Sequence, residues 1–143
     1  MIQPDAVAPA DEVSPAAPEV GTVPLISVLI PVHDPPPEML EQAIASVHTQ
    51  TFTSWELCLV DDGSTNPAIT TALARHAASD PRIRLARHDR PGGISTATNA
   101  ALELAAGEFI ALLDHDDTLA PDALEHVAHR IAGRARPGHA PQR

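Results

Sequence analysis

The sequence predicts an α/β fold, namely an open, mainly parallel, Rossmann-like sheet of about four strands flanked by helices. Two observations predict it. Short apolar runs alternate with segments whose apolar residues recur at helical spacing, which is typical of α/β architecture. The order of these segments is β-α-β-α-β-α-β-α, and this order implies parallel pairing through right-handed crossovers. Both patterns lie within residues 23–132, which we interpret as one domain.

Composition separates this domain from the two ends of the chain. Residues 1–22 contain four prolines, four acidic residues and no aromatic residue. Such a stretch cannot bury enough apolar surface to offset the entropy of ordering it, so we expect a disordered tail. Residues 133–143, with the sequence GRARPGHAPQR, show no apolar periodicity, and we expect a second unstructured tail there.

The first two strands and the helix between them follow from apolar patterning. Residues 25–32 form a nearly continuous apolar run, as a central parallel strand requires. A helix is expected from about Pro36, because apolar residues recur on one face at Leu40, Ile44 and Val47. The second strand is expected at residues 55–60, with the sequence WELCLV.

The alternation continues through the rest of the domain. Asn66 followed by Pro67 is an N-cap and first-turn signal for a helix over residues 66–78. A short strand is expected at residues 83–85.

Another helix, one strand and a last helix complete the pattern. A helix from about Ile94 is expected to stop at Gly107, a residue type common at helix ends. The fourth strand is expected at the apolar run of residues 109–113, with the sequence FIALL. Pro121 opens the last predicted helix, whose apolar face contains Leu124, Val127 and Ile131.

Charge and composition exclude several classes of function. The chain of 143 residues has 9 basic and 19 acidic residues, a net charge of −10, and is not expected to bind nucleic acid. All nine basic residues are arginine, so no lysine can form a Schiff base. The single cysteine, Cys58, excludes an internal disulfide and is most simply a buried strand residue. No apolar run approaches the roughly 20 residues of a transmembrane helix, and we expect a cytoplasmic protein, with peripheral membrane attachment left open.

Polar clusters follow three of the predicted strands, at residues 31–34, 61–64 and 114–117. The carboxyl ends of parallel strands share one edge of the sheet, where ligands bind. About six carboxylates would therefore meet at this edge and repel one another, and a bound cation would remove the conflict. Carboxylates without cysteine ligands suit a hard ion, Mn²⁺ or Mg²⁺, which usually keeps substrate phosphates as further ligands. The pattern predicts a clamp for a metal and a diphosphate.

These motifs also have structural interpretations, which the sequence leaves open. Residues 61–64 could form only a turn and a helix cap, and residues 114–117 only a solvated cap. Residues 91–93, Pro-Gly-Gly, could cradle a phosphate at a helix N-terminus or form a simple turn. His126 and His129 lie one helical turn apart, but a solvated face is the preferred interpretation over a metal site.

Four segments in this order resemble the nucleotide-binding half of a family 2 glycosyltransferase with the GT-A type of fold. They are SVLIPVHD at 27–34, LVDDGS at 59–64, Gly92 to Asn99, and GEFIALLDHDD at 107–117. The resemblance covers about residues 24–132. It implies inverting transfer of a sugar from a nucleotide-diphosphate donor, a UDP- or dTDP-sugar, to a hydroxyl of a glycan or a lipid-linked acceptor.

The resemblance also implies which residues contact the nucleobase. Pro31, Val32 and His33 would border it. Asp62, with Asp61 as the alternative, would accept a hydrogen bond from it. His33 stands where the family more often has an aromatic residue.

Further roles follow for the Asp-x-Asp segment and the preceding helix. By the same resemblance, Asp114 would face the ribose. Asp116 would ligate Mn²⁺ or Mg²⁺, with Asp117 in support. Arg90 and Asn99 lie where the family has donor-binding groups.

The expected catalytic base is missing from the matched region. The family's general base follows the Asp-x-Asp strand by many tens of residues, whereas only 26 residues follow Asp117, and neither Asp122 nor Glu125 is a convincing base. We therefore expect a truncated chain whose base lies beyond its end. The alternative is a non-catalytic fragment that binds nucleotide-sugar or metal. A phospho-receiver domain is a remote third hypothesis, because it would need a lysine that this chain lacks.

Overall fold

Four parallel strands form the centre of the structure, a computed structural model that describes residues 24–134. In space their order is β3-β2-β1-β4, and every neighbouring pair is parallel. Their bounds are Ile26–Val32 (β1), Trp55–Asp62 (β2), Ile83–His88 (β3) and Phe109–Leu112 (β4). The predicted α/β fold with a parallel sheet is confirmed. The predicted tail at 1–22 and residues 135–143 of the second predicted tail lie outside the described residues.

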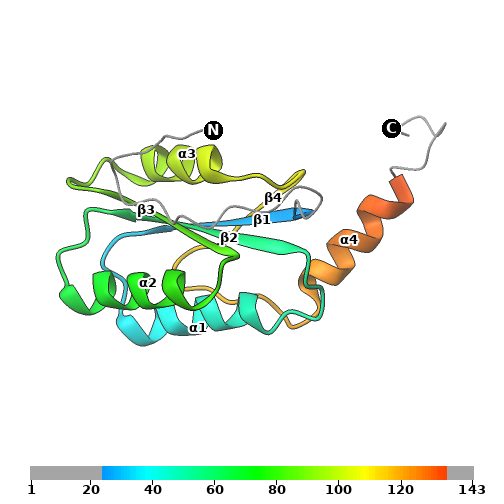
Figure 1. Ribbon diagram of the computed structural model, residues 1–143, viewed down its shortest axis with the longest axis horizontal. Coiled ribbons are helices and arrows are strands. Elements are labelled where there is room, and N and C mark those ends of the chain that lie inside the picture. Colours follow the sequence, from blue (N-terminus) through cyan, green and yellow to red (C-terminus); the bar gives the residue numbers. More distant parts are fainter. Residues whose placement is uncertain (1–23, 135–143) are drawn as a thin grey trace.

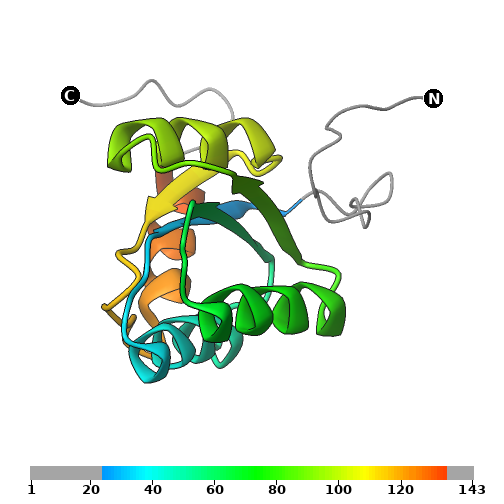
Figure 2. The ribbon, with the colours of Figure 1, turned by 90° about the vertical axis from the view of Figure 1, so that its left-hand side faces the viewer.

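Helices cover both faces of this sheet (Figure 1). Helices α1 (Pro37–His48) and α2 (Pro67–Ser79) lie on one face and α3 (Ile94–Leu104) on the other, as the view along the sheet shows (Figure 2). The last helix, α4 (Ala123–Arg134), extends two residues past the predicted domain limit of 132. Among residues 24–134, no helix combines the length and the apolar character needed to span a membrane.

The hydrophobic core consists of two clusters, one on each face of the sheet. The larger cluster joins β1 and β2 to the apolar faces of α1 and α2, and includes Leu40, Ile44 and Val47. On the other face, the small side chains of Ala97 and Ala101 let α3 pack against Leu29, Cys58 and Val60. Because β1 and β2 are covered on both faces, their sequences read as continuous apolar runs rather than alternating ones.

Cys58 is fully buried in β2, as expected. Burial, together with the neighbouring Glu56 carboxylate, raises the pKa of the Cys58 thiol far above its ordinary value. The thiol is therefore a core group rather than a nucleophile.

Two predicted boundaries differ from the structure by three residues, and the others by at most two. β3 reaches His88, three residues beyond the predicted end, because its last residues pair in register with Val60 to Asp62 of β2. The prediction that Gly107 ends α3 is wrong, since the helix ends at Leu104.

Gly107 instead allows the chain before β4 to lie close to the backbone of β1 at Ser27. Its N–H donates to Ser27 Oγ at 2.8 Å, and a Cβ atom on this residue would lie only 2.6 Å from that oxygen. Ser27 Oγ in turn donates to the buried carboxylate of Glu56 at 2.6 Å, which also accepts from Ala106 N. These bonds fix the entry to β4, whose opposite end leads into residues 114–117.

Candidate functional site

A pocket of about 370 Å³ lies at the carboxyl ends of the strands. β1 separates β2 from β4, so the segments that follow these three strands meet at this edge. The pocket is lined by Pro31, Val32, His33, Asp62, Pro91, Gly93, Ile94, Ala97 and His115. Its walls are therefore mainly apolar, with one carboxylate and two imidazoles among them.

Asp62 is the carboxylate of this pocket, and it is held by three donors. Its Oδ1 accepts from Gly92 N at 2.9 Å and meets His88 Nδ1 at 3.2 Å, and its Oδ2 accepts from Gly93 N at 2.9 Å. Burial raises the pKa of the Asp62 carboxyl, but these hydrogen bonds outweigh burial and hold the pKa below its ordinary value. Asp62 is thus an ionised acceptor at neutral pH.

The turn at residues 91–93 is explained by the same contacts. Both glycine N–H groups already donate to Asp62, and Gly93 has a φ of +97° that glycine adopts without strain. The structure therefore supports the turn interpretation of this segment over a phosphate cradle.

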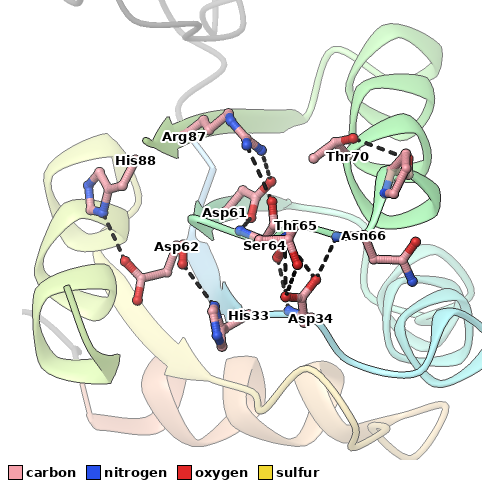
Figure 3. A network of polar contacts seen from close by, with 11 residues as sticks. His33, Asp34, Asp61, Asp62, Ser64, Thr65, Asn66, Thr70, Arg87 and His88 are labelled. Atoms are coloured by element: carbon pink, nitrogen blue, oxygen red, sulfur yellow. Dashed lines mark hydrogen bonds and ion pairs between the residues drawn. The ribbon is translucent and has the colours of Figure 1, made fainter. Parts of the chain in front are cut away.

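Asp61 has a different environment, although it is the next residue (Figure 3). Its Oδ1 accepts from Ser64 N at 2.9 Å and its Oδ2 pairs with Arg87 Nη1 at 2.5 Å. Side chains alternate along a strand, so Asp61 and Asp62 point to opposite faces of β2. Asp61 is absent from the pocket lining, whereas Asp62 is part of it.

The turn after β1 is tied to the turn after β2. Asp34 has a positive φ of +46°, and its carboxylate accepts from Thr65 N and Asn66 N (Figure 3). Hydrogen bonds from Asn66 and Thr65 lower the pKa of Asp34. Sequence reasoning placed Asp34 only in a polar cluster. The available signal for its role was an aspartate directly after a strand, a residue type that tolerates left-handed backbone.

His33 and His115 both line the pocket and contact each other. His33 Nδ1 lies 2.9 Å from the carbonyl oxygen of Asp62, and His33 N donates to His115 Nδ1 at 3.3 Å. The first histidine follows β1 and the second lies within the 114–117 segment. The structure thus brings together two histidines from different polar clusters of the sequence.

Asp114, Asp116 and Asp117 form an exposed acidic cluster after β4. Each can offer one carboxylate oxygen such that the three oxygens lie within 4.8 Å of one another. A tight turn, in which Asp117 N donates to Asp114 O at 3.1 Å, gathers them. Oxygen ligands in this number fit a hard divalent cation that completes its shell with water or phosphate.

The other predicted site residues lie outside the main pocket. Asn99, on α3, lines a second and more open hollow of about 300 Å³ together with Ile94, Ser95 and Thr98. Arg90 is exposed in the loop after β3 and lines neither of these hollows. On α4, His126 pairs with Asp122 at 3.0 Å on an exposed face.

Comparison with known proteins gives a consistent result. A sequence profile described as Glycosyl transferase family 2 matches residues 27–135. The chain is 50% identical over 108 residues to the uncharacterized protein y4gI of Sinorhizobium fredii, a match that covers 76% of this chain and 12% of that protein. It is 40% identical over 105 residues to the O-antigen biosynthesis protein RfbC of Myxococcus xanthus, covering 73% and 8%. The chain thus spans a small part of these relatives.

Solved structures show the same similarity. Residues 1–349 of TarS from S. aureus superpose with a TM-score of 0.68 at 26% identity, over 77% of this chain and 33% of that one. The mannosyltransferase PcManGT from Pyrobaculum calidifontis, in complex with GDP-Man and Mn²⁺, gives a TM-score of 0.68 at 25% identity, over 86% and 36%. These neighbours confirm the GT-A type of fold.

Proposed function

The chain belongs to glycosyl transferase family 2, and on that premise we propose that it binds the donor in an inverting sugar transfer. The donor would be a nucleotide-diphosphate sugar, with UDP- or dTDP-sugars as the first candidates, and the acceptor a hydroxyl of a glycan or a lipid-linked glycan. One observation supports this most. The apolar pocket that contains the Asp62 carboxylate is also lined by His115. His115 lies in the same short segment as the acidic cluster of Asp114, Asp116 and Asp117.

The pocket suits a nucleobase. Pro31 and Val32 of β1, together with Ile94 and Ala97 of α3, offer apolar surface to a flat ring. Asp62 would accept a hydrogen bond from an N–H of the base, because its carboxylate is ionised and its place is set by three donors. His33 would border the same ring. Asp61 is the weaker alternative, because its two oxygens are bonded to Ser64 and Arg87.

The acidic cluster suits the diphosphate end of the donor. Asp116 and Asp117 would hold Mn²⁺ or Mg²⁺, and Asp114 would face the ribose. When bound, such an ion supplies positive charge that stabilises the negative charge developing on the departing diphosphate. The similar mannosyltransferase is in complex with both GDP-Man and Mn²⁺, which supports this choice of ion. Asn99 and Arg90 are proposed as further donor contacts, from the second hollow and from the loop after β3.

The type of product is suggested by the relatives. Their names include O-antigen biosynthesis and chondroitin synthase, so we propose a polysaccharide or a similar glycan as the final product. The alternative of nucleotide-sugar binding without transfer is tested by the same experiment as the main proposal.

Titration calorimetry of the full chain with UDP, dTDP and GDP, with and without Mn²⁺, tests donor binding. We expect a nucleoside diphosphate to bind in a manner that depends on Mn²⁺. The absence of binding for all three would refute the proposal. A parallel transfer assay with the corresponding nucleotide sugars separates the two outcomes, since binding without transfer would favour the non-catalytic alternative.

A further inference from the structure

His88 has a specific relation to the pocket, although it does not line it. It is the last residue of β3, and its Nδ1 lies 3.2 Å from Asp62 Oδ1 (Figure 3). The side chain of His88 is 28% exposed, whereas that of Asp62 is 6% exposed. An ionised carboxylate can only accept hydrogen bonds, so the Nδ1 of His88 must be protonated. Within residues 24–134, His88 is the side chain that donates to this carboxylate.

The three donors to Asp62 limit how its carboxylate can turn. A carboxylate has about four acceptor positions, and Gly92, Gly93 and His88 occupy three of them. The two glycine amides belong to one turn and lie side by side in the chain. His88 comes from a different element, so it ties the carboxylate to β3 as well as to this turn. One acceptor position is left over for a ligand in the pocket.

We propose that His88 is a positioning residue that makes Asp62 select nucleobases with a ring N–H. This inference rests on the proposed function, because it assumes that the base of a nucleoside diphosphate enters this pocket. Uracil, thymine and guanine each present a ring N–H that can donate to a fixed carboxylate. Cytosine and adenine present an unprotonated ring nitrogen at the corresponding position, and a carboxylate repels its lone pair.

The two other imidazoles of the pocket do not replace His88 in this role. His33 Nδ1 contacts the main-chain oxygen of Asp62 rather than its carboxylate, and His115 contacts the backbone of His33. Loss of His88 therefore leaves Asp62 held only by the turn at residues 92–93. The carboxylate can then shift together with this turn, and its discrimination between the two kinds of base is weakened.

The test is calorimetric titration of the full chain in the presence of Mn²⁺. It compares the dissociation constant of UDP with that of CDP, and the dissociation constant of GDP with that of ADP. For whichever of UDP and GDP binds, His88→Ala should raise the dissociation constant about fivefold, because the carboxylate is no longer held in its binding position before the ligand arrives. The preference over CDP or ADP should fall by a similar factor. His88→Asn places an amide N–H near the position of Nδ1, and it should restore the preference to within about twofold.

A matched control removes another histidine–aspartate pair. His48 Nε2 lies 3.0 Å from Asp80 Oδ2, and the His48 side chain is 29% exposed, close to the value for His88. This pair lies at the opposite edge of the sheet, beside Trp55. His48→Gln should leave both dissociation constants unchanged, which separates a local effect from a general loss of stability.

The outcomes are distinct. Equal weakening of both members of a pair in His88→Ala, or no recovery in His88→Asn, would overturn the role of His88 while the proposed function stands. If the wild-type chain binds none of UDP, dTDP or GDP, the inference and the proposed function fall together.

Discussion

The carboxylate of Asp34 accepts a hydrogen bond of 3.0 Å from the backbone N–H of Asn66, and so joins the end of β1 to the start of α2. Asn66 at the same time caps α2, since its side chain accepts from Ala68 N at 3.0 Å. The turn that bears His33 is therefore positioned by the neighbouring helix as well as by β1. Hydrogen bonds thus join two loops that follow different strands into one rim.

The role of Asp34 predicts an order of stability among its variants. Asp34→Asn retains one side-chain acceptor and tolerates the positive φ. Asp34→Gly tolerates the positive φ but has no acceptor, and Asp34→Ala has no acceptor and is strained at a positive φ. The urea midpoint should fall in that order, with Ala lowest. Glu103→Ala, at an exposed position of α3, is the control and should stay near wild type. Equal midpoints for Asn and Ala would contradict this account of the rim.

The acidic cluster predicts a separation between metal binding and folding. Asp116→Ala should abolish the Mn²⁺ dependence of UDP binding while the unfolding midpoint stays unchanged, because the side chain is exposed and belongs to the proposed metal site. Calorimetry with and without Mn²⁺ measures the first effect and urea denaturation the second. Asp122→Ala removes an exposed carboxylate outside the cluster and should keep the metal dependence. An Asp116→Ala protein with unchanged metal dependence would refute the assigned site.

The pKa of Asp62 predicts how stability depends on pH. Because the folded-state pKa is depressed below the ordinary 3.8, the ionised carboxylate stabilises the folded protein above that value. This contribution is lost as pH falls through the folded-state pKa. The difference in free energy of unfolding between wild type and Asp62→Asn should thus be constant from pH 7 to about 5 and shrink below about 4.

The groups around Asp62 are common to both proteins in that comparison. They are His88 on β3, His33 after β1, His115 after β4, and Asp89 and Arg90 in the loop before the glycine turn. A difference that persists unchanged down to pH 2 would show that the Asp62 carboxylate does not stabilise the fold.

Two glycines predict opposite effects of the same substitution. Gly107→Ala would place its Cβ 2.6 Å from Ser27 Oγ and 2.9 Å from Ser27 N, so it should destabilise the protein by about 1–3 kcal/mol. Gly133→Ala, in α4, meets nothing within 4 Å and should be neutral or stabilise by up to about 1 kcal/mol. Urea denaturation measures both. A Gly107→Ala protein as stable as wild type would show that the Ser27 contact can relax without cost.

Much of the site was predictable because local patterns specify it. The strand-ending clusters at 61–64 and 114–117 are visible in the sequence, and parallel topology alone places them at one edge. The partners of Asp62 were not predictable. His88 was expected outside the third strand, and its contact with Asp62 depends on a pairing between β2 and β3 that extends to the last residue of each.

The sequence by itself determined the order of strands and helices, the buried character of β1 and β2, and the edge where polar residues gather. These follow from apolar periodicity and chain connectivity, which are local properties. Only the tertiary structure decided that Asp62 rather than Asp61 faces the pocket, and that Gly107 serves a backbone contact rather than a helix end. In both cases the deciding contact joins segments far apart in the sequence, α3 with β2 in the first and Gly107 with Ser27 in the second. Asp61 and Asp62 point to opposite faces of β2 because side chains alternate along a strand. The packing of α3 against one face of the sheet determines which of these faces holds the pocket.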